Sequence, residues 1–404
     1  MALKEFYETI GIDRLFVQFQ PIFCIGSRKI IGIEALLRGE NSKGLVSPKE
    51  LFERAECKNV KVELDRVARK LAFEEFKKHF LSDTEFLLFF NFDASILDTG
   101  QRRAWYIHRL VKKAGIPPNR VVIEVIETKV KNFQKLKKFV EVYRNLGFLI
   151  ALDDVGIEYS NLSRIPEIKP DFIKIDRALI KGVEKNEYKR KVLKSLAGLA
   201  KDVGSFTIAE GVERDSEILA TLEMGVNFHQ GYRLGSPVSA KEFFTTEFVK
   251  ELTSLRNRFV FYFKSIAGKK KQVYETYKSI VCQFTRKFKK VKLRTTFEKK
   301  LKKLIEGVSS IQSAYIVDMS GCLITDINFN SKYLNPDKKF FFIYRKGDNL
   351  CFYDYIYYLL SGEFDRYITE PYIHPFTKNR VCTVSQIFKN YLGYRFILCI
   401  DFLI

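Results

Sequence analysis

Strand-length apolar runs alternate with helix-length amphipathic segments through the first part of this 404-residue chain. Most of the runs rich in Val, Ile and Phe are followed by a segment of about ten or more residues with apolar side chains three and four apart. Parallel strands need a crossover of that length between them, so this order predicts a parallel sheet covered by helices. Eight strands in about 230 residues match the size of a closed TIM-like (β/α)8 barrel of the α/β class. The strands are expected at Phe16–Phe23, Ile30–Leu37, Glu85–Phe92, Val121–Ile126, Phe148–Asp153, Phe172–Ile175, Phe206–Ala209 and Val226–His229.

An open, doubly wound sheet is the alternative fold for such an alternation. Sheets of that kind that bind a dinucleotide carry a G-x-G-x-x-G turn after their first strand. No such turn follows Phe23. The closed barrel is therefore the favoured fold.

Glu34 lies within the apolar run Ile31–Arg38, which has the composition of a strand buried on both faces. A buried carboxylate is costly unless a positive side chain or a metal ion lies beside it. A core ion pair is the ordinary explanation of such a residue, and a metal ligand is the alternative. Whether Glu34 is a metal ligand depends on whether the other strands of the expected barrel supply further ligands.

Polar side chains collect where the expected strands end, which is the edge at which α/β barrels carry their chemistry. The carboxylates among them, together with Glu34, would repel one another unless cations lay between them. Oxygen ligands with few histidines favour Mg²⁺ or Mn²⁺ over zinc, and adjacent aspartates can place one carboxylate between two ions. Individually, these positions also fit ordinary turn residues and an exposed lysine. The strand-end residues are Asn91, Glu124, Asp153, Asp154, Lys174, Glu210 and Gln230.

The formal net charge of +21 is unevenly distributed. Residues 1–250 carry 42 Lys and Arg against 35 Asp and Glu, whereas residues 251–404 carry 27 against 13. Lys264–Lys303 holds 15 basic residues, and its apolar positions at Val273, Tyr277, Phe284 and Phe288 follow helical spacing. A solvated helix that links two domains is the favoured interpretation. A helix that forms a dimer, or one that contacts anionic lipid or nucleic acid, is the alternative.

Seven cysteines are scattered along the chain without a CxxC pair. This usage predicts reduced thiols rather than a disulfide or zinc framework. The sequence has no run of 18 apolar residues, and Met1–Ile10 lacks the apolar centre of a signal peptide. We therefore expect a cytoplasmic protein with no stable membrane span.

The chain resembles the EAL-domain cyclic di-GMP phosphodiesterases, whose family name is the tripeptide found here at Glu34-Ala35-Leu36. The resemblance implies a barrel that binds cyclic di-GMP at its mouth. It also implies two Mg²⁺ or Mn²⁺ ions in each active site and hydrolysis of one phosphodiester bond, which yields linear pGpG. The other matching motifs are Gln20-Pro21, Asn91, Glu124-x-x-Glu127, Asp153-Asp154-x-Gly156, Lys174-Ile175-Asp176, Ala209-Glu210-Gly211-Val212-Glu213, and Gln230-Gly231-Tyr232 with Pro237.

The resemblance implies a role for each matching residue. The residues similar to the ligands of one ion are Glu34, Asn91, Glu124 and Asp153, and those similar to the ligands of the second are Asp153 and Asp154. Lys174 is similar to the residue that contacts the attacking water, and Glu210 to the general base. The residues similar to substrate contacts are Gln20, Leu37, Arg38, Asp176, Gln230 and Pro237, and those similar to loop anchors are Glu127 and Glu213.

One segment departs from the family's pattern. Members usually read Asp-Asp-Phe-Gly-Thr/Ala-Gly-Tyr/Phe-Ser, whereas this chain reads Asp153-Asp154-Val155-Gly156-Ile157-Glu158-Tyr159-Ser160. Glu158 in place of glycine removes a residue that adopts a positive φ cheaply and adds a charge beside the ion site. We expect hydrolysis weakened by this loop, and a catalytically inactive cyclic di-GMP receptor is the alternative. The chain has no GG(D/E)EF motif, so it is not expected to synthesise the dinucleotide.

The C-terminal part has β-rich runs at Ser313–Ile327, Val381–Phe388 and Tyr394–Ile404, with helix-like Tyr353–Leu360 between them. This mixture predicts a smaller α+β domain that is similar to PAS/Cache-like sensor folds, and the whole chain resembles the two-domain YkuI type. We expect an EAL barrel over 1–250, basic linker helices over 251–309 and the sensory domain over 310–404. The expected partners are cyclic di-GMP, a second copy of the chain, and a small ligand or protein at the C-terminal domain. Nucleic-acid binding is not expected.

Overall fold

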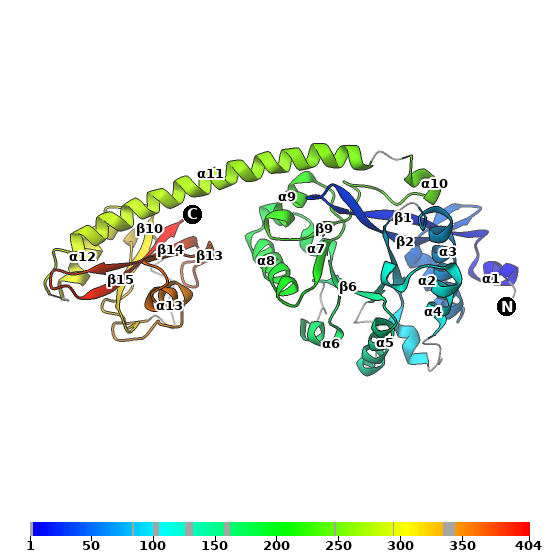
Figure 1. Cartoon of the computed structure of the whole chain (residues 1–404), viewed down its shortest axis with the longest axis horizontal. Coiled ribbons are helices and arrows are strands. Elements are labelled where there is room, and N and C mark those ends of the chain that lie inside the picture. The colour runs from blue at the N-terminus through cyan, green and yellow to red at the C-terminus, as the bar shows by residue number, and fades with distance from the viewer. Residues whose placement is uncertain are drawn as a thin grey trace. The chain divides into compact units, whose positions relative to one another are not determined.

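The computed structural model describes residues 3–82, 85–99, 105–125, 132–156, 162–245, 248–293, 295–333 and 344–404. The chain forms two compact units, Met1–Phe261 and Tyr262–Ile404 (Figure 1). No helix within these ranges is long and apolar enough to cross a lipid bilayer. All seven cysteines are free thiols, as the sequence predicts.

The first unit contains a closed barrel, which confirms the predicted fold. Its strands follow the order β1-β9-β8-β7-β6-β5-β4-β2, and β1 pairs with β2 to close the ring. Neighbouring strands from β2 through β9 run parallel, whereas β1 is antiparallel to both β2 and β9 because β1 and β2 form a hairpin. The strands are β1 Arg14–Cys24, β2 Lys29–Asn41, β4 Leu87–Phe92, β5 Val121–Val125, β6 Leu149–Val155, β7 Phe172–Ile175, β8 Phe206–Ala209 and β9 Phe228–His229, with the short β3 Gly44–Val46 added at the edge of β2.

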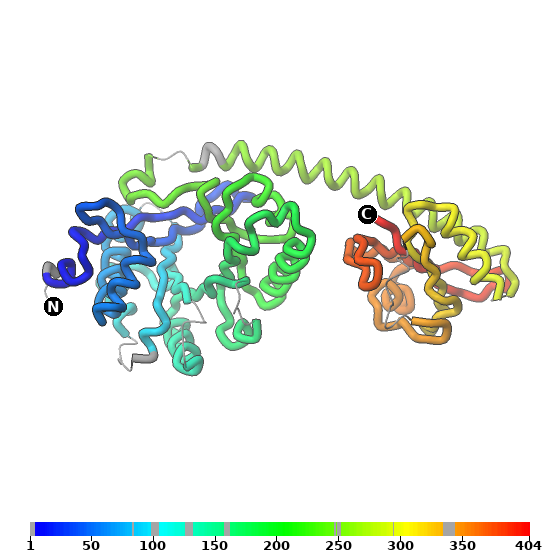
Figure 2. Tube along the Cα trace, turned by 180° about the vertical axis from the view of Figure 1, so that it is seen from behind, coloured from blue at the N-terminus to red at the C-terminus, as the bar shows by residue number. Residues whose placement is uncertain are grey.

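Helices surround the strands of the barrel (Figures 1 and 2). Helix α2, Pro48–Cys57, begins after Ser47, whose hydroxyl accepts a hydrogen bond from the backbone N–H of Glu50, and Pro48 occupies the first turn. The other helices of this unit are α1 Leu3–Ile10, α3 Lys61–His79, α4 Tyr106–Ala114, α5 Phe133–Asn145, α6 Ile165–Ile168, α7 Arg177–Ile180, α8 Glu187–Asp202, α9 Asp215–Glu223 and α10 Ala240–Phe243.

The barrel interior is filled by an apolar layer that supports a polar one. Successive side chains on a strand point to opposite faces, so residues two apart share a face. The apolar layer comprises Ile22, Phe89, Val122, Ala151, Phe172 and Ile208, all buried. Two residues farther along β4 to β8, the same face carries Asn91, Glu124, Asp153, Lys174 and Glu210. The polar side chains of five strands therefore meet at one end of the barrel.

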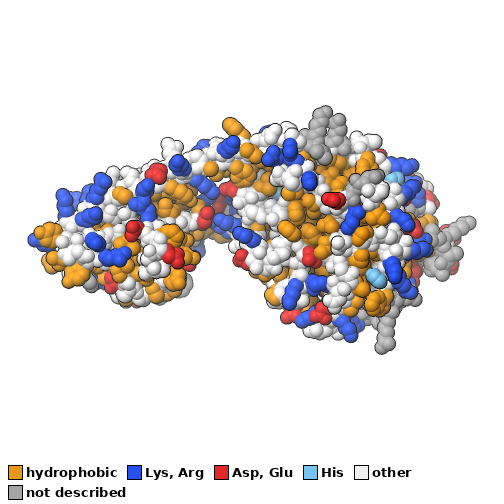
Figure 3. Space-filling model, in the orientation of Figure 1, with side chains coloured by type: hydrophobic (Ala, Val, Ile, Leu, Met, Phe, Trp, Pro, Cys, Tyr) orange, Lys and Arg blue, Asp and Glu red, His pale blue; other side chains and the backbone are white. Residues whose placement is uncertain are grey.

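The second unit is an antiparallel α+β domain preceded by a long helix, as predicted. Helix α11 spans Phe248–Phe288 and α12 spans Thr295–Glu306. Their apolar residues, among them Phe284, Phe288 and Phe297, pack on one face of the sheet. Lys and Arg side chains are spread over the visible surface of both units (Figure 3). The remaining elements are β10 Ile311–Asp318, β11 Asn328–Phe329, α13 Asp354–Leu360, β12 Arg366–Ile368, β13 Tyr372–Ile373, β14 Arg380–Lys389 and β15 Arg395–Leu403.

Candidate active site

The ammonium group of Lys174 lies at the centre of the polar layer. Its Nζ is 2.6 Å from Glu210 Oε1 and 2.7 Å from Glu124 Oε1. It is also 3.3 Å from Glu34 Oε2 and 3.5 Å from Asp153 Oδ1. These four carboxylates come from different strands, and the Lys174 side chain is 1% exposed. One buried lysine therefore joins the strands β2, β5, β6 and β7 to the residue that follows β8.

Amide side chains hold the carboxylate of Glu34 from two sides. Asn91 Nδ2 donates a hydrogen bond of 2.8 Å to Glu34 Oε1, and Gln230 Nε2 donates one of 2.7 Å to Glu34 Oε2. Gln230 Nε2 also lies 3.1 Å from Gln20 Oε1, and Gln20 in turn donates to the carbonyl of Gly235. The orientation of Glu34 is thus fixed by residues far apart in the sequence.

The carboxylates outnumber the positive charge available to them. Glu34, Glu124, Asp153 and Glu210 surround the ammonium of Lys174, so full ionisation would leave these five side chains with a net charge of −3, which is four negative charges less one positive. A surplus of this size in a buried site favours either bound protons or bound cations.

The pKa values of these groups follow from that surplus. Burial raises the pKa of Glu210 from 4.5 to about 8, although Lys174 opposes the shift. Burial and the neighbouring Glu34 raise the pKa of Glu124 well above its usual value, and burial raises that of Asp153. Burial also opposes ionisation of Glu34, but Lys174, Gln230 and Asn91 lower its pKa. Protons and a cation would therefore compete for these carboxylates.

Three of these side chains present oxygen atoms to a common point. Ligand atoms of Asp153, Asp154 and Glu210 all lie within 4.8 Å of one another. Asp154 adopts a left-handed backbone conformation with φ of 57°, which is uncommon for a residue other than glycine and occurs often at functional sites. Glu124 Oε2 is buried without a hydrogen-bond donor among the described residues. An all-oxygen set with an unsatisfied carboxylate oxygen fits Mg²⁺ or Mn²⁺.

The predicted substrate contacts are only partly gathered around this centre. Arg38 Nε donates a 2.9 Å hydrogen bond to Gln18 Oε1 at the barrel mouth. Asp176 caps α7 by accepting from the backbone N–H of Ala178. Leu37 packs in the apolar cluster beneath α1 and α2 and lines a cavity of about 470 Å³ beside Asn91. Pro237 is half-buried and precedes Val238, which pairs with β1 at Phe19. Their roles toward a substrate stay predictions.

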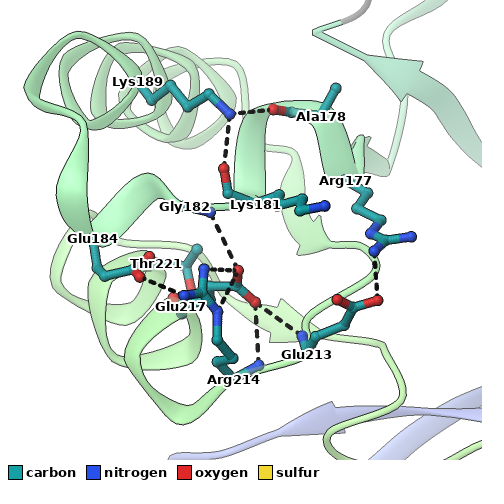
Figure 4. Close-up of polar contacts among 10 residues, drawn as sticks. All are labelled: Arg177, Ala178, Lys181, Gly182, Glu184, Lys189, Glu213, Arg214, Glu217 and Thr221. Carbon is teal, nitrogen blue, oxygen red and sulfur yellow. Dashed lines mark hydrogen bonds and ion pairs between the residues drawn. The ribbon is translucent and has the colours of Figure 1, made fainter.

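The loop that carries Glu210 is anchored by an acidic residue of α9 (Figure 4). Glu217 accepts hydrogen bonds from the backbone N–H groups of Gly182, Glu213 and Arg214, and from the guanidinium of Arg214. Glu213, a predicted anchor, forms a 2.6 Å ion pair with Arg177. The other predicted anchor, Glu127, lies outside the described residues, as do Ile157–Ser160 of the altered loop.

Two residues of the site were not anticipated from the sequence. Gln18 orients Arg38, and its position two residues before Gln20 on β1 was the available signal, because both side chains share a strand face. Glu217 accepts a hydrogen bond from the backbone N–H of Arg214, the N-cap residue of α9, and its signal in the sequence is a carboxylate three residues after the cap.

Gly231 connects the end of β9 to the following turn at a point of close backbone approach. A Cβ atom at this position would lie 2.2 Å from the backbone nitrogen of Val212. Any other residue would therefore push this segment away from the loop that follows Glu210. Glycine at this position allows Gln230 to reach Glu34.

Comparison of the sequence with known proteins identifies relatives of the barrel unit. The sequence profile of the EAL domain matches residues 3–237. The chain is 30% identical over 231 residues to the uncharacterized EAL-domain containing protein YkuI of Bacillus subtilis, which covers 56% of each chain. It is 27% identical over 233 residues to the cyclic di-GMP phosphodiesterase PdeB of Shewanella oneidensis, which covers 57% of this chain and 27% of PdeB.

A full-length structural likeness accompanies these sequence matches. The crystal structure of B. subtilis YkuI in complex with substrate c-di-GMP and calcium superposes with a TM-score of 0.80 at 22% identity, and the match covers 100% of this chain and 99% of that one. This likeness extends over both units and supports the two-domain fold. The barrel, the EALLR strand and the profile match over most of the first unit lead to one conclusion: the chain belongs to the EAL domain family.

Proposed function

We propose that this protein hydrolyses cyclic di-GMP to linear pGpG in a reaction that depends on Mg²⁺ or Mn²⁺. The observation that carries the proposal is the cluster of four carboxylates around the Lys174 ammonium at the barrel mouth, with Asp154 beside Asp153 and Glu210. Membership of the EAL domain family supports it, as do the relatives named as cyclic di-GMP phosphodiesterases. A bacterial second-messenger role follows from that substrate.

Two divalent ions are expected in the site, and its residues fit them. One would be held by Glu34, Asn91, Glu124 and Asp153, and the other by Asp153 and Asp154. Because Asn91 donates its Nδ2 to Glu34, its Oδ1 remains as an oxygen ligand. When bound, the ions supply positive charge that stabilises the developing charge on phosphate and lowers the pKa of water.

The remaining residues would bind the substrate and move protons. Lys174 would position the attacking water, and Glu210, 2.6 Å from its ammonium, would accept the proton of that water. Arg38 presents a guanidinium at the mouth, suited to a phosphate of the dinucleotide. Gln20 and Gln230 offer amide groups for the polar edge of guanine. The water oxygen would then bond to phosphorus as one P–O bond of the ring breaks, and the leaving ribose oxygen would take up a proton from solvent to give the linear product.

A catalytically weak or inactive receptor is the second candidate. The sequence observation behind it is the departure at Val155 and Glu158, which changes the segment after the two aspartates. In this alternative the barrel binds cyclic di-GMP without hydrolysing it. The second unit would then act on a partner, and a homodimer is expected in either case.

The deciding experiment incubates the purified full chain with cyclic di-GMP and Mn²⁺ or Mg²⁺ and measures pGpG by chromatography. We expect pGpG to form with either ion and to disappear with excess EDTA. Glu34→Ala should abolish ion binding and turnover, whereas Glu53→Gln, an exposed residue of α2, should change neither. Tight binding of cyclic di-GMP without any pGpG would establish the receptor instead. Full turnover in Glu34→Ala would rule out the site.

A further inference from the structure

The second unit contains a large cavity whose walls are made of aromatic rings. It has a volume of about 890 Å³, and eight of its sixteen described lining residues are Tyr or Phe. Pockets for small organic ligands commonly measure about 300–1,000 Å³. The cavity lies on the face of the sheet opposite α11 and α12, beside α13. Its size is thus that of a ligand site.

The charge of this cavity is opposite to that of the domain around it. Residues 251–404 carry 27 Lys and Arg against 13 Asp and Glu. The described lining nevertheless contains Asp354, Glu370 and Asp401 and no Lys or Arg. Asp354 and Glu370 are exposed, whereas Asp401 is 3% exposed and lies on β15 at the inner wall. One buried and two exposed carboxylates, with no lysine or arginine in the described lining, favour a cationic ligand in this cavity.

Asp401 contributes charge to the cavity more than hydrogen-bonding capacity. Thr383 Oγ1 donates to its Oδ1 at 2.6 Å and Tyr372 Oη lies 3.4 Å from the same oxygen. Ser313 donates to its Oδ2. Three of the roughly four acceptor positions of the carboxylate are therefore used by hydroxyl groups of the protein. A cation that needs no hydrogen-bond acceptor suits this wall better than a primary amine.

The aromatic side chains stay uncharged and so can face a cation. Burial raises the pKa values of Tyr315, Tyr355 and Tyr372, and burial lowers that of His374. Tyr315 Oη and Tyr355 Oη are joined by a 2.9 Å hydrogen bond, which holds both rings in the wall. Aromatic faces attract alkylated ammonium groups through their quadrupoles, most strongly where water is excluded.

We propose that this cavity binds a small quaternary ammonium cation. The aromatic lining supplies cation–π attraction and apolar contact for methyl groups. Asp401 supplies the countercharge at the inner wall, and Asp354 and Glu370 extend the negative potential outward. The site is separate from the carboxylate cluster of the barrel, and this assignment does not depend on hydrolysis of cyclic di-GMP.

The test titrates the full chain by calorimetry and thermal shift with choline and tetramethylammonium chlorides. Its reference compounds are 3,3-dimethylbutan-1-ol, the neutral isostere of choline, and sodium chloride at equal ionic strength. We expect choline to raise the melting temperature and the neutral isostere to bind about tenfold more weakly or worse. Equal affinity for choline and its isostere, or no binding of either cation, would overturn the proposal.

Substitutions in the cavity lining test whether choline binds there. Asp401→Asn keeps the shape of the carboxylate and should weaken choline binding about tenfold, while exposed Glu363→Gln should leave it unchanged. If Asp401→Asn does not fold, Tyr367→Leu tests the site instead, because it removes one ring of the cavity from the short edge strand β12. Its control is Tyr394→Leu, because Tyr394 is 59% exposed and lies outside the cavity lining. Choline binding that survives in each folded cavity variant would contradict the site. Glu34→Ala should bind choline normally, which separates this result from any failure of hydrolysis.

Discussion

Lys174 Nζ lies 2.6 Å from Glu210 Oε1, so the lysine proposed to position water and the carboxylate proposed to take its proton form an ion pair. The contact follows from the parallel pairing of β7 with β8, in which Lys174 is opposite Ile208 and Glu210 comes two residues later. The same lysine also contacts Glu34, Glu124 and Asp153. A change at either end of this pair should therefore affect the whole carboxylate cluster.

Replacing Glu210 by glutamine should separate chemistry from binding. Glu210→Gln keeps the size of the side chain but removes the group that accepts a proton, and a general base contributes about 10²–10⁴-fold to rate. We expect kcat for pGpG formation to fall by that factor while cyclic di-GMP still binds in calorimetry. Unchanged turnover would remove Glu210 from its proposed role, and Glu53→Gln serves as the control.

Replacing Lys174 by methionine should destabilise the metal-free protein. The variant leaves buried carboxylates without their ammonium, and breaking a buried ion pair from one side costs about 3–5 kcal/mol. We expect a lower melting temperature in EDTA at pH 8 and partial recovery with Mn²⁺, because an added cation restores positive charge. Lys201→Met, at an exposed position near the end of α8, should leave stability unchanged. A melting temperature equal to wild type in EDTA would contradict this account of the cluster.

Mn²⁺ affinity should rise with pH. Burial raises the pKa of Glu210 from 4.5 to about 8 although Lys174 opposes the shift, so protons compete with a cation for this carboxylate increasingly as the pH falls below 8. Cations favour the ionised form, so binding must release protons below that pH and affinity should increase from pH 6.5 to 8 and level off above it. Calorimetry in two buffers of different ionisation enthalpy measures the protons released. In Glu210→Gln, the plot of Mn²⁺ affinity against pH should be flat near pH 8. A pH-independent Mn²⁺ affinity in the wild-type protein would contradict the prediction.

Glu217→Gln should loosen the segment between β8 and α9. Glu217 is 2% exposed and accepts from the backbone of Gly182, Glu213 and Arg214. Loss of a charged acceptor from these bonds should lower the free energy of unfolding by about 2–3 kcal/mol. Denaturant unfolding measures this loss, and Glu53→Gln should show less than about 1 kcal/mol because its ion pair is exposed. Stability equal to wild type would show that other contacts hold the segment.

Much of the barrel could be predicted because its signals are local. Alternation of apolar runs and helical segments defined the strands, and the spacing of two residues defined which side chains share a face. Phe89 with Asn91, Val122 with Glu124, and Phe172 with Lys174 each show an apolar residue followed by a polar one on the same face. The gathering of these residues at one end of the barrel could therefore be anticipated.

Other features had no local signal. The β1–β2 hairpin has a local signal in the turn Gly26-Ser27-Arg28, but the pairing of β1 with β9, which closes the ring, joins strands far apart in the sequence. The predicted basic helix ends at Phe288 and resumes at Thr295, because Val291 and Phe297 turn into the core of the second unit. The aromatic cavity combines side chains from Tyr315 to Asp401, whose spacing in the sequence carries no periodic pattern.

The sequence by itself determined the class of fold, the identity of the strand-end residues and the family resemblance, since each is written in residue types at short spacing. Only the tertiary structure decided that one ammonium, from Lys174, lies among four carboxylates and that Asp401 faces an aromatic cavity. The physical reason is that charge balance and burial depend on distances between side chains far apart in the chain. Those distances are set by closure of the barrel and packing of the second sheet, not by any local preference.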